Sequence, residues 1–319
     1  MENQIKPEEE LKSLETTEKK PPDDKMLSLS IVLAALIIAG TWVYTSGYNS
    51  TSFKKLGGNV LPKDGGSLTQ LEDAVLPLEG IVLPVKWGDL GLKLVSAGVI
   101  DPKKFKDIYK NRNNLSGEIQ KYLEGRDDER IKINDSNSGL WLNLFWALGL
   151  GNKNSILTQG PLSDPRYGGA GNFASTGGWT IANGDILDHL ARHPFIILTK
   201  EQQELVERVS KNIYRPCCNN STYFPDCNHG MAMLGLLELM ASRGISEEEM
   251  YKIALQVNSY WFPDTYITVA KYFKSRGREW NRVNPREILG KDYSSATGYQ
   301  RILTEVEPPQ NRSGGGCGV

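Results

Sequence analysis

The stretch MAMLGLLELMAS, residues 231–242, decides the fold that the sequence predicts. Its side chains are apolar on nearly every side of a helix, and a helix of this kind lies in the interior of a protein. We therefore expect residues 231–242 to form a helix at the centre of the hydrophobic core.

Signals for the beginning of a helix recur along the chain on both sides of this stretch. Asp101 followed by Pro102 is typical of an N-cap and the first helical residue. Thr199 precedes a glutamine by three positions, and Ser246 precedes Glu249 in the same way, which is the pattern of a capping box. Apolar residues follow at helical spacing in each case, so these positions predict further helices.

These signals predict an all-α or mainly α domain that extends from about residue 75 to 305. Strand signals are sparse and fall on residues 130–134. Residues 149–183 form a long Gly-rich stretch, and a loop of this length in a compact domain is often functional. The Gly-rich end of the chain, residues 306–319, predicts a flexible tail that carries Cys317.

The composition narrows the class of protein. The chain has 319 residues, of which 39% are hydrophobic and 24% charged, and this is enough apolar material for a folded core. Its 37 Lys and Arg residues nearly balance 38 Asp and Glu residues, which leaves a net charge of -1. Because recognition of a nucleic acid usually requires a basic face, we expect no nucleic-acid partner.

The N-terminal part of the sequence predicts a membrane anchor. Residues 26–44, MLSLSIVLAALIIAGTWVY, carry no charge and would span about 28 Å as a helix, close to the roughly 30 Å of a bilayer core. We expect a single transmembrane helix over residues 26–45, with the lipid bilayer as its partner. A disordered charged tail, residues 1–25, would precede it, and a flexible stalk, residues 46–74, would follow.

The lysines beside this segment indicate its orientation. Lys19, Lys20 and Lys25 stand directly before the apolar run, whereas Lys54 and Lys55 follow it at a greater distance. Positive charge gathers on the cytoplasmic side of a membrane. The N-terminus is therefore predicted in the cytoplasm and the main domain outside it, as an extracytoplasmic domain.

The sharpest chemical signal is the block RPCCNNSTYFPDCNHG, residues 215–230. It holds three of the four cysteines, Cys217, Cys218 and Cys227, together with His229. Turn-forming residues fill its middle, so we expect its two ends to approach each other. Cys227 and His229 would then stand at the N-terminus of the buried helix, where the helix dipole stabilises a thiolate.

Three hypotheses for this block remain open. A disulfide from Cys217 or Cys218 to Cys227 would staple the loop. Three sulfurs and the imidazole of His229 would form a Cys3His site for zinc or copper(I). A cysteine of lowered pKa would act as a reactive thiol.

A second group of candidate ligands precedes Pro194. If this segment is a helix, Asp185, His189 and His193 recur on one face, where they would bind a metal or exchange protons. The alternative is that Asp185 caps the helix and the histidines lie at its surface or end. We regard these three residues, with the flexible Cys317, as secondary ligands at most.

The sequence thus predicts a membrane-anchored extracytoplasmic protein whose Cys/His loop binds a soft transition metal or undergoes thiol–disulfide chemistry. One alternative is a cell-envelope hydrolase with a cysteine nucleophile, His189 or His193 as base and residues 149–183 as a lip for substrate. Another is a structural surface protein with a disulfide-stapled loop. Whether the protein is an enzyme stays open.

Overall fold

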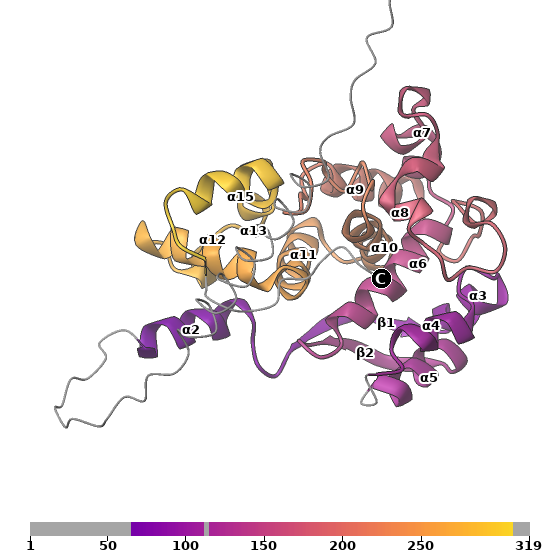
Figure 1. Ribbon diagram of the computed structural model, residues 1–319, viewed down its shortest axis with the longest axis horizontal. Helices are drawn as coiled ribbons and strands as arrows, with labels where there is room; N and C mark the ends of the chain where they lie inside the picture. Colours follow the sequence, from indigo (N-terminus) through magenta and orange to yellow (C-terminus); the bar gives the residue numbers. More distant parts are fainter. Residues whose placement is uncertain (1–64, 112–114, 309–319) are drawn as a thin grey trace, which may run out of the picture. The chain divides into compact units, whose positions relative to one another are not determined.

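The structure is a computed structural model that describes residues 65–111 and 115–308 (Figure 1). Helices dominate the described part, and they accompany one two-stranded sheet. The α-helices and strands are α2 (Gly65–Val75), β1 (Ile81–Gly88), α3 (Leu90–Ser96), α4 (Pro102–Ile108), α5 (Ser116–Glu124), β2 (Asp127–Ile133), α6 (Ser138–Gly151), α7 (Ser155–Gln159), α8 (Ala174–Gly177), α9 (Lys200–Ser210), α10 (Asn228–Ser242), α11 (Glu247–Trp261), α12 (Pro263–Ser275), α13 (Pro285–Ile288), α14 (Lys291–Ser294) and α15 (Ala296–Leu303). The short 3-10 helices are η2 (Pro161–Ser163), η3 (Pro165–Tyr167), η4 (Ala170–Asn172), η5 (Ile186–Asp188) and η6 (Trp280–Arg282).

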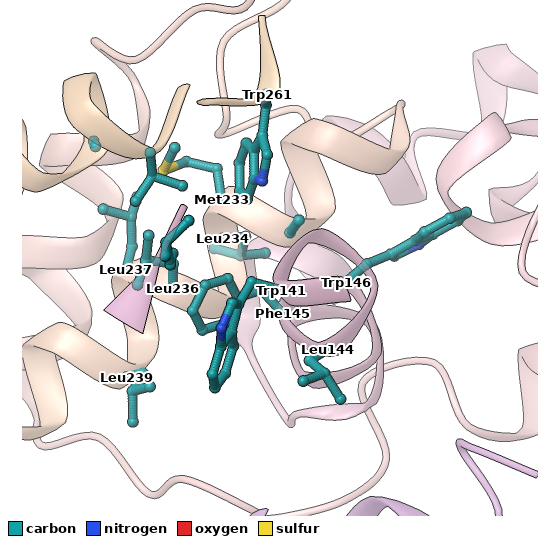
Figure 2. Packing of buried hydrophobic residues seen from close by; sticks show 14 of the residues in the cluster. Trp141, Leu144, Phe145, Trp146, Met233, Leu234, Leu236, Leu237, Leu239 and Trp261 are labelled. Carbon is teal, nitrogen blue, oxygen red and sulfur yellow. The ribbon is translucent and has the colours of Figure 1, made fainter. Parts of the chain in front are cut away.

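Helices α6 and α10 form the centre of the core, and Figure 2 shows buried side chains from both helices. The two backbones touch at Gly149 and Gly235. A Cβ atom on Gly149 would lie 2.2 Å from the carbonyl oxygen of Met231, and one on Gly235 would lie 2.3 Å from that of Phe145. Only glycine permits this approach. The prediction that residues 231–242 form a buried central helix is confirmed.

The predicted caps that begin α4 and α9 are also confirmed. The side chain of Asp101 accepts hydrogen bonds from the backbone of Lys103 and Lys104. Thr199 and Gln202 form both hydrogen bonds of a capping box. These helices begin where the sequence predicts because their caps satisfy backbone N–H groups locally.

The sheet is larger than the sequence predicts. Strand β2 contains most of the predicted strand at residues 130–134, and it pairs antiparallel with β1, with Ile81 opposite Ile133. The buried residues of β1 alternate with accessible ones, so one of its faces packs against the core. Strand β1 escaped the sequence analysis because Pro84 interrupts its pattern.

The predicted fold class is wrong in one respect. Among the described residues, no helix is both long enough and apolar enough to cross a membrane. The most apolar helices, α6 and α10, have 14 and 15 residues, which gives about 21 and 23 Å against a bilayer core of about 30 Å. Residues 26–45, for which the anchor is predicted, lie outside the described residues, as do the tail at 1–25 and most of the stalk.

Two further segments differ from the expectation. Helix α2 begins at Gly65, within the predicted stalk at residues 46–74, because Leu71 and Val75 are buried and α2 packs against α12. The Gly-rich stretch at 149–183 is a chain of short helices rather than an irregular loop. Side-chain caps at Asn154 and Asp164 start α7 and η3, and Gly160 and Gly168 end these two helices.

Candidate functional site

The loop between α9 and α10 brings the cysteines together. A β-bridge joins Tyr214 to Ser221, and the N–H of Thr222 donates to the carbonyl of Ile213 over 2.8 Å. The chain therefore turns back on itself, as its turn-forming residues predict. From the other side the N–H of Ala296, at the start of α15, donates to the carbonyl of Cys218 over 2.9 Å and holds the loop.

The sulfur atoms of Cys217, Cys218 and Cys227 all lie within 4.8 Å of one another, and we call these three residues the sulfur cluster. The closest measured pair is Cys217 Sγ and Cys227 Sγ at 3.3 Å. Cys217 and Cys227 are not joined by a disulfide in this structure, since 3.3 Å is far beyond the roughly 2.05 Å of an S–S bond. The predicted approach of the two ends of the loop is thus observed.

His229, in the first turn of α10, faces the sulfur cluster. Its Nδ1 lies 3.9 Å from Cys217 Sγ, and its side chain is buried. The imidazole packs against the ring of Phe262, with centroids 4.3 Å apart, and against Trp261 at 6.0 Å. These rings fix the orientation of the imidazole beside the sulfurs.

Arg215 completes the site, although no role is predicted for it from the sequence. Its side chain is only 1% exposed, and its Nε donates to Cys227 Sγ over 2.9 Å. The other guanidinium nitrogens donate to the carbonyls of Asn220 and Phe224 and to the carboxylate of Asp226. A signal was present, because Arg215 and Asp226 are the only Asp, Glu, Lys or Arg residues between 215 and 230.

Gly230 makes room for this arginine. A Cβ atom at position 230 would lie 2.4 Å from Cζ of Arg215, so any other residue would displace the guanidinium. The glycine that follows His229 is therefore part of the site.

The charges of the site favour a thiolate at one cysteine. Hydrogen bonds from Cys217 and Cys218, together with the charge of Arg215 and a hydrogen bond from His229, hold the pKa of Cys227 well below its usual range. The hydrogen bond with Cys217 acts to lower the pKa of Cys218, but its contact with Cys227 and its burial raise that pKa to about 11. Of these two cysteines, the site therefore favours the thiolate form at Cys227.

The neighbouring sulfurs also affect the pKa of Arg215. Burial acts to lower this pKa, but the neighbouring sulfurs, that of Cys227 first, raise it above its ordinary value. The arginine therefore keeps its positive charge inside the protein, where it is paired with the negative groups around it.

The Gly-rich stretch at 149–183 lies against the cysteine loop. The rings of Tyr167 and Phe173 pack on Phe224, with centroids 5.2 and 5.3 Å apart. The N–H of Ser175 donates to the carbonyl of Asp226 over 3.2 Å. This stretch therefore helps to position the sulfur cluster.

The second group of predicted ligands does not lie on an α-helix. Residues 186–188 form the 3-10 helix η5, and the alternative prediction that Asp185 is a cap is confirmed, because its side chain accepts from the N–H of Leu187. The three residues therefore do not share one face of an α-helix. The chain then turns through Ala191, which has φ +53°. His189 and His193 nevertheless face each other, with Nδ1 of the first 3.1 Å from Nε2 of the second.

In the described part of the chain, neither of these histidines is hydrogen-bonded to a cysteine. His189 Nε2 bonds the carbonyl of Asn183 over 2.8 Å, and burial first, then the charge of His189, lowers the pKa of His193. The histidine beside the sulfurs is His229. The predicted base of the hydrolase alternative is therefore not brought to a cysteine, while Cys317 lies outside the described residues.

A second buried ionisable group lies farther along α10, and the sequence analysis missed it. Glu238 is fully buried, and its two carboxyl oxygens accept hydrogen bonds from the side-chain amides of Asn152 and Asn154. Burial raises the pKa of Glu238 to about 8, although both amides act to lower it. Its partners stand far from it in sequence, so no local pattern marks the contact.

The sequence matches no protein-family model, no curated protein and no solved structure. Because fold alone does not define an activity, a function has to be argued from the residues of the site.

Proposed function

We propose that Cys217, Cys218, Cys227 and His229 bind a soft transition-metal ion, Zn²⁺ or Cu⁺, in a four-coordinate site. The observation that carries the proposal is the mutual approach of three sulfurs within 4.8 Å. Tetrahedral zinc bound at about 2.3 Å requires sulfurs about 3.8 Å apart, so small movements of the side chains would complete the site.

The charge around the cluster supports the same proposal. Three thiolates and a divalent ion carry a net charge of about -1, and a buried negative charge requires a partner. The guanidinium of Arg215 lies 2.9 Å from Cys227 Sγ through its Nε and provides that partner. A hydrogen bond to a metal-bound thiolate also fixes its orientation.

The donor set indicates which ions to test. Thiolates prefer Zn²⁺ and Cu⁺ to hard ions such as Mg²⁺ and Ca²⁺. The two candidate ions differ in geometry, since zinc requires the imidazole as a fourth ligand whereas Cu⁺ accepts three sulfurs. Whether metal binding depends on His229 therefore distinguishes zinc from Cu⁺.

The test is the metal content of the full chain, purified under reducing conditions and loaded with Zn²⁺. We expect one bound ion per chain, and the replacement of zinc by Co²⁺ should produce the thiolate charge-transfer absorption of a tetrahedral site. Cys227→Ser should abolish binding, whereas Cys317→Ser, the matched control, should retain it. Equal metal content in Cys227→Ser and the unchanged protein would disprove the proposal.

A second candidate function is thiol–disulfide exchange, which the 3.3 Å separation of Cys217 Sγ and Cys227 Sγ and the lowered pKa of Cys227 favour. A low-molecular-weight disulfide would accept the two electrons and two protons released as Cys217 and Cys227 join. Oxidised glutathione should then lower the mass of the chain by about two hydrogens, and zinc should block this reaction. A metal-free chain that keeps all its thiols in this experiment would exclude the exchange.

A further inference from the structure

A pair of facing imidazoles lies in the segment after η5. His189 Nδ1 and His193 Nε2 are 3.1 Å apart, and the two rings are inclined by 31°. We propose that His189 and His193 form a second metal site, selective for a divalent ion that prefers imidazole, with Cu²⁺ bound ahead of Zn²⁺. This site does not depend on the proposed function of the sulfur cluster.

The separation of the nitrogens suits two adjacent ligands of one ion. Imidazole nitrogens bind a metal at about 2.0–2.1 Å, and a nitrogen separation of 3.1 Å then gives an angle of about 98° at the ion. This angle lies between the 90° of a tetragonal Cu²⁺ site and the tetrahedral angle. Copper(II) also binds nitrogen ligands more tightly than the other divalent ions of its row.

The hydrogen bond behind His189 sets the correct tautomer. The carbonyl of Asn183 can only accept, so His189 Nε2 donates to it over 2.8 Å and Nδ1 keeps a lone pair. A carbonyl behind a ligating histidine is the usual partner of such a site. The ion would take the place of the proton between the rings, and His193 would then carry its proton on Nδ1.

The backbone holds the two rings in this position at the cost of a strained residue. Ala191 has φ +53°, in the left-handed region that alanine rarely adopts, and its N–H donates to the carbonyl of Leu150 over 2.9 Å. His193 is fixed through both backbone groups, by the carbonyl of Gly151 and the N–H of Lys153. Strain that the surrounding structure maintains often marks a functional position.

The site leaves room for further ligands. Both histidines are partly exposed, and the ring of His193 stacks on Phe195 with centroids 5.1 Å apart. One side of the pair is therefore supported by an aromatic ring. Two imidazoles with open coordination positions would bind Cu²⁺ together with water or a small anionic ligand.

The test is a titration of the zinc-loaded full chain with Cu²⁺, followed by electron paramagnetic resonance. A copper ion bound by two imidazoles gives nitrogen hyperfine structure, whereas copper that thiols have reduced gives no signal. We expect one such Cu²⁺ per chain, and we expect His189→Gln and His193→Gln each to weaken its binding at least tenfold.

Arg192→Gln is the matched control, because residue 192 is exposed and lies between the two ligands. It should bind Cu²⁺ as the unchanged chain does. Circular dichroism of each histidine variant should match the unchanged protein, since the pair is not in the central core. Nitrogen hyperfine structure of full intensity in both histidine variants would overturn the proposal, as would its absence from the unchanged chain.

Discussion

Helix α10 buries ionisable groups in two places and in two different ways. At its beginning, Cys227 lies in a network of opposite charges in which Arg215 is paired with sulfur and with Asp226. In its second half, Glu238 accepts hydrogen bonds from the neutral amides of Asn152 and Asn154, and no charged partner lies among the described residues. The first place keeps its charges because they are paired, whereas the second favours the protonated, neutral carboxyl.

The largest effect on stability is expected when Arg215 is removed from the first arrangement. Arg215→Met leaves the buried Cys227 and the partly buried Asp226 without their cation, and loss of one partner from a buried pair costs about 3–5 kcal/mol. We expect this loss of unfolding free energy in urea denaturation of the metal-free chain under reducing conditions. Arg208→Met, which removes an exposed arginine from its pair with Glu247, should have little effect. Equal stability of the two variants would contradict the role of Arg215.

The second arrangement should appear as a dependence of stability on pH. The folded chain binds the Glu238 proton more tightly than the unfolded chain, because the pKa rises from 4.5 to about 8 on folding. Stability due to this group is therefore complete below pH 4.5 and falls as pH rises toward 8. Between pH 5 and 8 the loss is about 3 kcal/mol.

Glu238→Gln should remove this dependence of the unfolding free energy on pH. The difference in unfolding free energy between the variant and the unchanged chain should therefore vary with pH. Glu248→Gln, on the exposed surface of α11, is the control and should leave the dependence in place. A pH profile of Glu238→Gln that runs parallel to that of the unchanged chain would show that Glu238 is ionised in the folded protein.

Two glycines allow a finer test of the charged network. Gly230→Ala places a methyl group 2.4 Å from Cζ of Arg215, and we expect a loss of about 1–3 kcal/mol as the guanidinium shifts. In Gly117→Ala the new methyl group meets no side chain or other segment of the described residues within 4 Å, and alanine favours helix α5. Thermal unfolding should therefore give a Tm below that of the unchanged chain for Gly230→Ala and above it for Gly117→Ala. A stable Gly230→Ala chain would mean that Arg215 can move without cost.

The smallest effect on stability is expected at Ala191, which lies between the two histidines and outside both arrangements. Ala191→Gly removes the penalty of φ +53° but adds the conformational freedom of glycine to the unfolded chain. We expect a net gain of about 0.5 kcal/mol in unfolding free energy, measured by urea denaturation. A loss of stability on this substitution would show that the methyl group of Ala191 contributes more through packing than its backbone strain costs.

Much of the fold follows from local patterns in the sequence. Asp101 and Thr199 satisfy backbone groups within their own helices, so their effect is visible in a few consecutive residues. The turn residues between Cys218 and Cys227 likewise predict the approach of the sulfurs, which the structure shows. The metal chemistry of this cluster and the membrane orientation stay predictions.

What the sequence analysis missed depends on contacts between distant segments. Glu238 obtains its partners from the segment after α6, and no periodicity in α10 indicates them. The sequence left open whether the segment before Pro194 is a helix, and the α-helical alternative is not observed because Ala191 hydrogen-bonds to α6 and leaves the helical region. Arg215 belongs to the block at residues 215–230, but its burial depends on the space that Gly230 provides.

The separation of these contacts along the chain bears on the order in which the protein assembles. Arg215 and Cys227 are 12 positions apart, whereas Asn152 and Glu238 are 86 positions apart. Closing a short loop costs less entropy than closing a long one, so the cysteine loop can form before α6 docks on α10. A metal ion would then also find its ligands in the unfolded chain, and it would stabilise the folded protein by less than its affinity alone suggests.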